Sequence, residues 1–153
     1  MQKITIRRAR IDELPLLLEF EQSLINSERP FDDTFIPERF HYYDIALMIE
    51  QPDAEVLVAE IDDEVIGSGH ARIKDAKHYD QTGQFAYLGF MYVKPEHRGK
   101  GINRMIIEAL INWAKGKGLT EARLQVYDEN VSAVKAYEKV GFKKQLVVMR
   151  RSL

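Results

Sequence analysis

The chain has 153 residues, of which 45% are hydrophobic and 30% charged, with a formal net charge of −2 and no cysteine. This composition is typical of a soluble globular protein, and we expect residues 1–153 to form one domain. The lack of cysteine excludes disulfide bonds and thiolate metal sites, and we expect no metal cofactor. The start of the chain lacks a signal-peptide pattern, and no apolar run approaches the roughly 20 residues that cross a bilayer. We therefore predict a cytoplasmic protein with no membrane partner.

Charge is distributed unevenly along the chain. Residues 1–53 carry 6 Lys/Arg and 11 Asp/Glu, a balance of −5, whereas residues 54–153 carry 16 and 13, a balance of +3. Two interpretations stay open: an uneven solvated surface, or an acidic half that faces a substrate and a basic half that holds an anion. Because neither balance is large, we expect no extended nucleic-acid surface.

The first half of the chain contains regular patterns separated by an acidic loop. In chain order they predict a strand at 3–9, a helix that Asp12 caps, a loop at 26–39, a helix from Glu38 to about Glu50, and a hairpin formed by 54–61 and 64–73. The loop contains two prolines and clustered acids, and Pro52 lies just beyond the second helix.

The second half has the clearest helix of the sequence. A long aromatic-rich strand is predicted at 84–93. Apolar residues then recur at helical spacing on one stripe, namely at Ile102, Met105, Ile106, Ala109, Leu110 and Trp113. This helix is followed by a predicted strand at 121–128, a helix that Asn130 caps and that ends at Gly141, and a final strand at 142–150. The order predicts one α/β domain without internal repeats or linkers.

The stretch YVKPEHRGKG, residues 92–101, joins the aromatic strand to the clear helix. Strand, helix and following strand form a βαβ unit, so the two strands should be parallel. The first N–H groups of a helix lack internal partners, and two glycines would let an anion approach them closely. The stretch is either an anion site or a surface turn with solvated cations, and its place at a helix start favours the anion site.

Two nucleotide-binding motifs do not fit this turn. A Walker A loop requires Gly-x-x-x-x-Gly-Lys-Ser/Thr, which is absent. A dinucleotide fingerprint requires a third glycine where Arg104 stands, and it should open a much longer doubly wound domain. We exclude both motifs.

The hexapeptide Glu96-His-Arg-Gly-Lys-Gly101 resembles the acyl-CoA-binding signature of the GCN5-related N-acetyltransferases (GNAT superfamily), Gln/Arg-x-x-Gly-x-Gly/Ala. Glu96 stands where the family usually has Gln or Arg, and Asn103 where many members have another small residue. The segment ENVSAVKAYEKVGF, residues 129–142, resembles the family's Asn…Ala…Tyr…Gly-Phe segment. The resemblance implies an α/β fold with a mixed, mostly antiparallel central sheet, helices on both faces and a β-α-β acyl-CoA-binding core.

The resemblance also implies where acetyl-CoA, as co-substrate, would bind. The main chain from Arg98 to Arg104 would hold the diphosphate, which assigns Arg98, Gly99, Lys100, Gly101, Ile102, Asn103 and Arg104 to the cofactor. Met91, Tyr92 and Val93 would line the pantetheine arm, and the backbone of Met91 and Val93 would pair with it. The strands at 84–93 and 121–128 would splay apart to admit the arm, and Asn130 would contact the cofactor.

Tyr137 corresponds to the family tyrosine near the sulfur and is the expected general acid, although helical spacing also fits an amphipathic core position. The general base stays open. Many members carry a glutamate on the strand before the turn, but QFAYLGFMYV contains no acid. Glu28, His70, Tyr87 or a water chain are candidates.

The resemblance implies transfer of an acetyl group to a primary amine, in a small molecule or a protein, by direct attack in a ternary complex. The alternative is a non-catalytic acyl-CoA-binding sensor or interaction module. Glu28, Asp32 and Asp33 lie in the loop that would wall the acceptor pocket, where they would attract a cationic amine or form a solvated acidic surface. The last strand could be an edge through which a homodimer forms, or one that its lysines protect from pairing.

Overall fold

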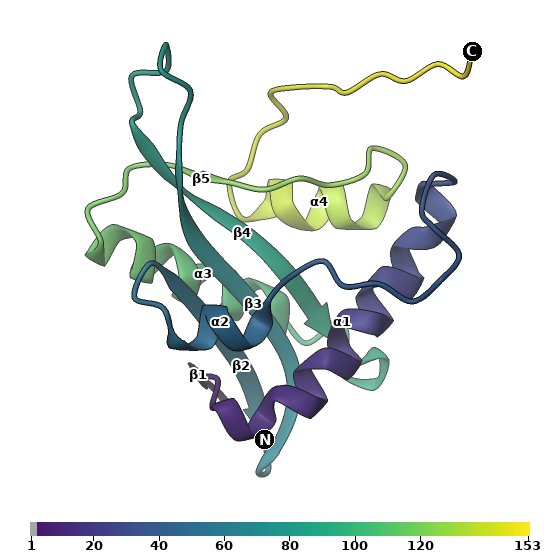
Figure 1. Cartoon of the computed structure of the whole chain (residues 1–153). Helices are drawn as coiled ribbons and strands as arrows, with labels where there is room; N and C mark the ends of the chain where they lie inside the picture. Colours follow the sequence, from purple (N-terminus) through teal and green to yellow (C-terminus); the bar gives the residue numbers. More distant parts are fainter. Residues whose placement is uncertain (1–2) are drawn as a thin grey trace.

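The computed structural model describes residues 3–153, which form a five-stranded mixed sheet with helices on both faces (Figure 1). The strand order is β1-β2-β3-β4-β5, with bounds Ile4–Arg8, Ala54–Ile61, Glu64–Asp75, Gln84–Val93 and Ala122–Arg123. The first three pairings are antiparallel, and β4 and β5 are parallel. The predicted hairpin, the βαβ unit and the mostly antiparallel mixed sheet are confirmed.

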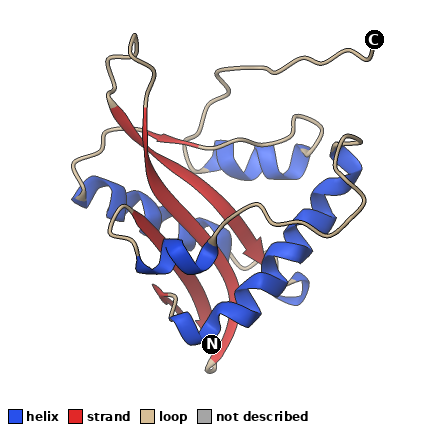
Figure 2. Ribbon diagram, in the orientation of Figure 1, coloured by secondary structure: helices blue, strands red, loops and turns tan. Residues whose placement is uncertain are grey.

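The helices enclose the sheet from two sides (Figure 2). The helices are α1, α2, α3 and α4, with bounds Leu14–Glu28, Ile45–Glu50, Ile102–Gly116 and Val131–Lys139, and short 3-10 turns lie at Ile11–Glu13, Arg29–Phe31 and Pro95–His97. Helices α1 and α2 contribute to one hydrophobic cluster, and α3 contributes to the other. The predicted fold class is therefore confirmed.

The alternation of side chains in β2 explains the two cores. Val56 and Val58 face the cluster with α1 and α2, whereas Leu57 and Ala59 face the cluster with α3. The predicted stripe of α3 supplies Ile106 and other buried residues of the second cluster. Burial of one such side chain contributes about 1.5–3 kcal/mol to the stability of the fold, so packing in the core fixes both β4 and α3 on either side of their connection.

Several predicted boundaries are wrong. Helix α2 begins at Ile45 instead of Glu38, because the Asp44 side chain accepts a hydrogen bond from the Leu47 amide and caps the helix there. Asp12 does not cap α1, since it lies inside the 3-10 turn that precedes that helix. Strand β5 has two residues instead of eight, because its pairing with β4 ends after Arg123.

The predicted final strand is also wrong. Residues 142–150, all of which the structure describes, form no strand and run away from the sheet toward the C-terminus (Figure 1). A strand needs a neighbour to pair its backbone groups, and none lies beside this segment among the described residues. Its four consecutive apolar residues, 146–149, are each 72% to 89% exposed. The homodimer through this segment stays a prediction.

Candidate active site

The turn after β4 gives α3 an open N-terminus. Gly99 and Gly101 have φ angles of 80° and 76°, in the left-handed region that glycine adopts without strain. A Cβ at either glycine would meet nothing within 4 Å, so space for a ligand lies beside both. The first backbone bond of the helix runs from the Met105 amide to the Gly101 carbonyl, and no described side chain caps the start. The amides of residues 102–104 are therefore free for an anion.

Three cationic side chains surround this turn. Arg98 donates through Nε to the Val93 carbonyl at 3.1 Å, which ties the turn to the end of β4. Lys100 Nζ lies 3.0 Å from Nδ1 of His97. Arg104 faces Glu108 one helical turn away, with both side chains at least half exposed. Their positive charge adds to that of the helix dipole at the same place.

Strand β4 carries an irregularity just before the turn. Ser68 pairs with Tyr92 and His70 with Gly89, so β4 has one more residue than β3 in this interval. Phe90 at this bulge has a φ angle of 57°, which is unusual for a bulky residue. Its carbonyl accepts a bond from the Ser68 hydroxyl at 3.1 Å, and its amide donates to the Tyr43 hydroxyl oxygen at 3.0 Å. Two side chains thus hold the bulge in place.

The other side of β4 is open near its end. Within the described residues, β4 and β5 pair only at Ala86 with Ala122 and at Tyr87 with Arg123. The strand segment from residue 88 to Val93, which includes the predicted Met91 and Tyr92, has no strand partner on this side. An extended ligand could pair with this free edge.

Tyr137 lies on α4 and packs against the core on the α3 side. Its ring meets Phe142 edge to face, with 6.1 Å between ring centroids. Burial raises the pKa of Tyr137 to about 12, and the charge of Glu28 contributes to the rise. The hydroxyl therefore keeps its proton at neutral pH and can donate it. Asn130 accepts a bond from the Ala133 amide through its side chain, so it caps α4 as predicted.

Glu28, the last residue of α1, is half-buried and accepts a hydrogen bond from Tyr42. Burial raises the pKa of its carboxyl group above the usual 4.5. Its charge in turn helps to raise the pKa of five tyrosines, which are Tyr42, Tyr43, Tyr87, Tyr127 and Tyr137. The charge of Glu28 thus acts on Tyr137, the predicted general acid, and on Tyr87, another candidate base.

Aromatic rings line the same region. Phe35 lies 5.4 Å from Phe40, 6.1 Å from Tyr42 and 6.4 Å from Tyr127, measured between ring centroids. Phe31 stacks on Tyr127 at 6.2 Å. This aromatic cluster joins the loop between α1 and α2 to the segment after β5, which the sequence does not place together.

The two aspartates of the predicted acidic loop differ in surroundings. Asp32 receives hydrogen bonds from the Tyr127 hydroxyl at 2.8 Å and from Thr34, and it pairs with Arg150 at 3.0 Å. These bonds hold the pKa of Asp32 far below its usual value. Asp33 is exposed to solvent. Of the three acidic residues predicted to line the acceptor pocket, Asp32 is therefore the one whose charge Arg150 already neutralises.

His70 is fully buried, 4.7 Å from the Tyr43 ring, and burial lowers its pKa to about 4. It lies against Gly89, where an added Cβ would come within 2.5 Å of the imidazole. Neither ring nitrogen makes a well-formed hydrogen bond within the described residues. The neutral imidazole packs against the β4 bulge, and we interpret His70 as a residue that stabilises this part of the sheet.

Glu21 is a buried residue that the sequence does not single out. It has no exposed surface, and its carboxylate accepts the Tyr42 and Tyr43 amides at 2.9 and 3.0 Å and contacts His41 Nδ1 at 2.5 Å. This carboxylate fixes the loop that carries two of the site's tyrosines. Its place on the inner face of α1 is the only sequence signal for such a role.

Two further features of residues 3–153 concern cofactors and membranes. No group of three or more His, Cys, Asp or Glu side chains among them is arranged to hold a metal ion. No helix in this part of the chain is both long and apolar enough to cross a membrane.

The fold has close counterparts among solved structures. A mutant protein from Bacillus halodurans superposes with a TM-score of 0.86 at 19% identity, over 97% of this chain and 99% of that one. A predicted acetyltransferase from Clostridium acetobutylicum, solved with acetyl-CoA, superposes with a TM-score of 0.70 at 19% identity, over 98% and 96% of the two chains. Both likenesses, at 19% identity, show that this chain shares the fold of these proteins.

A comparison of the sequence with family models shows the family. The model of the acetyltransferase (GNAT) family matches residues 19–142, well over half of the chain. The chain belongs to this family, which confirms the resemblance stated for its two motifs.

Curated relatives are N-acetyltransferases or related enzymes. An IAA acetyltransferase of Azospirillum brasilense is 28% identical over 142 residues, covering 93% of this chain and 86% of that protein. A thialysine N-epsilon-acetyltransferase of Sus scrofa is 45% identical over 60 residues, covering 39% of this chain and 35% of that one. An uncharacterized N-acetyltransferase of Bacillus subtilis, YobR, is 46% identical over 55 residues, or 36% and 22%. The matches thus span only about a fifth to a third of the length of these last two relatives.

Proposed function

We propose that the protein transfers the acetyl group of acetyl-CoA to a primary amine by direct attack in a ternary complex. The observation that carries this proposal is the uncapped start of α3 behind two left-handed glycines. Its free amides, the helix dipole and nearby cations suit a diphosphate, bound by the main chain from Arg98 to Arg104. Family membership and the relative solved with acetyl-CoA support the choice of cofactor.

The free edge of β4 supports a binding mode for the rest of the cofactor. An extended pantetheine arm can pair with the backbone of Met91 and Val93 as an added strand would. The bulge at Phe90 redirects the backbone just before these residues. A backbone N–H near Met91 would then polarise the thioester carbonyl. In this proposal Tyr92 lines the arm, and Asn130 touches the cofactor from the start of α4.

Acetyl transfer to a protonated amine requires three proton movements. The ammonium group first loses one proton, which is released to solvent. The neutral nitrogen then bonds to the carbonyl carbon while the carbon–sulfur bond breaks, and in this step the nitrogen loses a second proton and the sulfur gains one. An alkyl amine has a pKa of ~10.4, and its deprotonation at neutral pH costs about 4–5 kcal/mol. We assign the nitrogen's second proton to Glu28, directly or through one water, and the sulfur's proton to Tyr137.

The pKa directions of these two groups agree with their roles. A carboxylate whose pKa is raised by burial is a stronger base than an exposed one, and Glu28 has such a shift. A phenol with a pKa of about 12 is fully protonated at pH 7, as a proton donor must be, and Tyr137 meets this condition. His70, neutral and buried under the bulge, is the weaker candidate base.

The acceptor is a cationic amine in this account. Glu28 supplies a negative charge, and the neighbouring ring faces attract cations. Asp32 is occupied by Arg150, so we assign the attraction mainly to Glu28, with exposed Asp33 adding long-range potential only.

A thiol-release assay with acetyl-CoA and a panel of amines tests the proposal. We expect release with at least one primary amine and a loss of turnover in Tyr137→Phe. Saturable binding of CoA with no release for any amine would instead identify the non-catalytic sensor module.

A further inference from the structure

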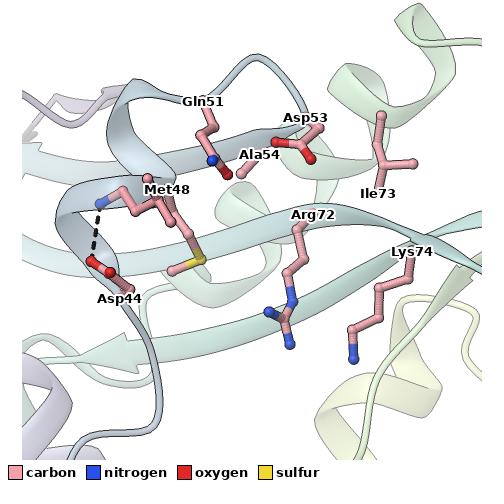
Figure 3. Close-up of a pocket in the computed structure, with 9 residues that line it drawn as sticks. Asp44, Met48, Gln51, Asp53, Ala54, Arg72, Ile73 and Lys74 are labelled. Atoms are coloured by element: carbon pink, nitrogen blue, oxygen red, sulfur yellow. Dashed lines mark hydrogen bonds between the residues drawn. The ribbon is translucent and has the colours of Figure 1, made fainter.

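Two cations of β3 lie side by side without an acidic partner. Arg72 and Lys74 are two residues apart, and both side chains extend to the same side of the strand (Figure 3). Among residues 3–153, no carboxylate lies within ion-pair distance of either group, although other half-buried cations such as Arg7 are paired. Like charges at such positions repel each other, so an anion between them would be stabilising.

Both cations are partly withdrawn from water. Arg72 and Lys74 are half-buried, and Arg72 Nε is buried without a hydrogen-bond partner. Burial, together with the neighbouring Arg72, lowers the pKa of Lys74. An unpaired buried N–H costs about 1–3 kcal/mol, which an acceptor atom would recover.

A hollow of about 240 Å³ adjoins the two cations, between β3 and the end of α2. Asp44 and Asp53 also line it, but Asp44 caps α2 and Asp53 makes no ion pair with either cation. No residue of the glycine turn lines this hollow, so it is distinct from the proposed diphosphate site.

Tyr87 connects the cation pair to the acceptor region. It lies opposite Arg72 in the β3–β4 register, with Lys74 Nζ 4.0 Å and Arg72 Cζ 5.6 Å from its ring centroid. The charges of Arg72 and Glu28 both act on the Tyr87 hydroxyl, in opposite directions. A ligand beside Tyr87 would thus lie close to two cations and within the electrostatic influence of the Glu28 carboxylate.

We propose that Arg72 and Lys74 bind an anionic group, a carboxylate or a phosphate, of an acceptor whose amine faces Glu28. The acceptor class is then an amino acid-like or phosphorylated amine, not a simple polyamine. This assignment of the acceptor rests on the proposed function, whereas the anion site itself does not.

Calorimetry on the CoA-loaded protein tests this site with pairs of amines that differ in one anionic group. The pairs are lysine against 1,5-diaminopentane, and O-phosphoethanolamine against ethanolamine. We expect the anionic member of at least one pair to bind about tenfold or more tightly, equivalent to ~1.4 kcal/mol. The pair that shows the preference identifies carboxylate or phosphate. The preference should vanish in Arg72→Gln/Lys74→Gln and persist in Lys77→Gln, an exposed cation of the adjoining loop.

Equal affinities within both pairs, or a preference that survives in the double variant, would overturn the anion site. Thiol release measured on the same samples separates this result from failure of the transferase assignment. A chain that prefers the anionic amines but releases no thiol keeps the site and loses the activity.

Discussion

Replacement of Glu28 by glutamine removes the charge that we assign to both acceptor binding and proton transfer, while it preserves side-chain size. The carboxylate lies half-buried beside Tyr42, so water screens it less than a surface acid. General bases typically contribute about 100- to 10,000-fold in rate. We expect kcat/KM for the best amine to fall by about 100-fold, a loss of ~2.7 kcal/mol of transition-state stabilisation.

The pH profile adds a second readout for Glu28. As pH falls through the raised pKa of this carboxyl group, protonation removes the base, so kcat/KM should fall on the acid side above pH 4.5. In Glu28→Gln that acid limb should disappear. Glu19→Gln, an exposed acid of the same helix, is the matched control and should behave as wild type.

Initial rates of thiol release between pH 5 and about 9 measure both effects. The reasoning fails if Glu28→Gln keeps kcat/KM within about threefold of wild type, or if the acid limb persists in the variant. An equal loss in Glu19→Gln would also refute it, because the effect would then be one of overall charge.

Three further predictions concern the general acid Tyr137, the glycine turn before α3 and Glu21, which fixes the loop before α2. Tyr137→Phe keeps the ring packed, so it should lower kcat about 10- to 100-fold and leave the CoA affinity measured by calorimetry unchanged. If the CoA affinity fell by the same factor, Tyr137 would have a role in binding only. Gly101→Ala forces a φ of 76° on alanine and should weaken CoA binding about 5- to 30-fold, whereas Gly116→Ala, with open space and no positive φ, should leave it unchanged. Glu21→Ala leaves two loop amides without their acceptor and should lower the unfolding free energy by about 3 kcal/mol in urea denaturation, against less than ~0.5 for exposed Glu19→Ala.

The sequence predicts best where local pattern and tertiary packing agree. The stripe of α3 and the β2–β3 hairpin are each set by residues within about 20 positions of one another. The turn before α3 is predicted for the same reason, because its two glycines directly precede the helix. The left-handed backbone at both glycines is a finding of the structure.

Long-range contacts explain what the sequence could not predict. Asp32 and Arg150 are 118 positions apart, and nothing local indicates that this aspartate is neutralised while Glu28 is not. The start of α2 depends on the Asp44 cap and on the hydrogen bond by which Glu21 fixes the preceding loop. Glu21 contacts this loop only in the folded chain. The segment 142–150 has strand-forming residues, but a strand also requires a neighbour.

The cation pair of β3 illustrates a further limit. Arg72 and Lys74 read as ordinary strand residues in the sequence, because alternation alone does not tell which face is enclosed by a helix. Their shared contact with Tyr87 emerges only from the register of β3 against β4.

The most direct measurement of the central claim is a titration of the isotope-labelled protein with CoA, followed through the backbone amide resonances in NMR. The account predicts saturable shifts that are largest for residues 99–104, where free amides and left-handed glycines meet at the start of α3. Saturation with no change at these amides, or no saturation at all by a folded protein, would contradict it.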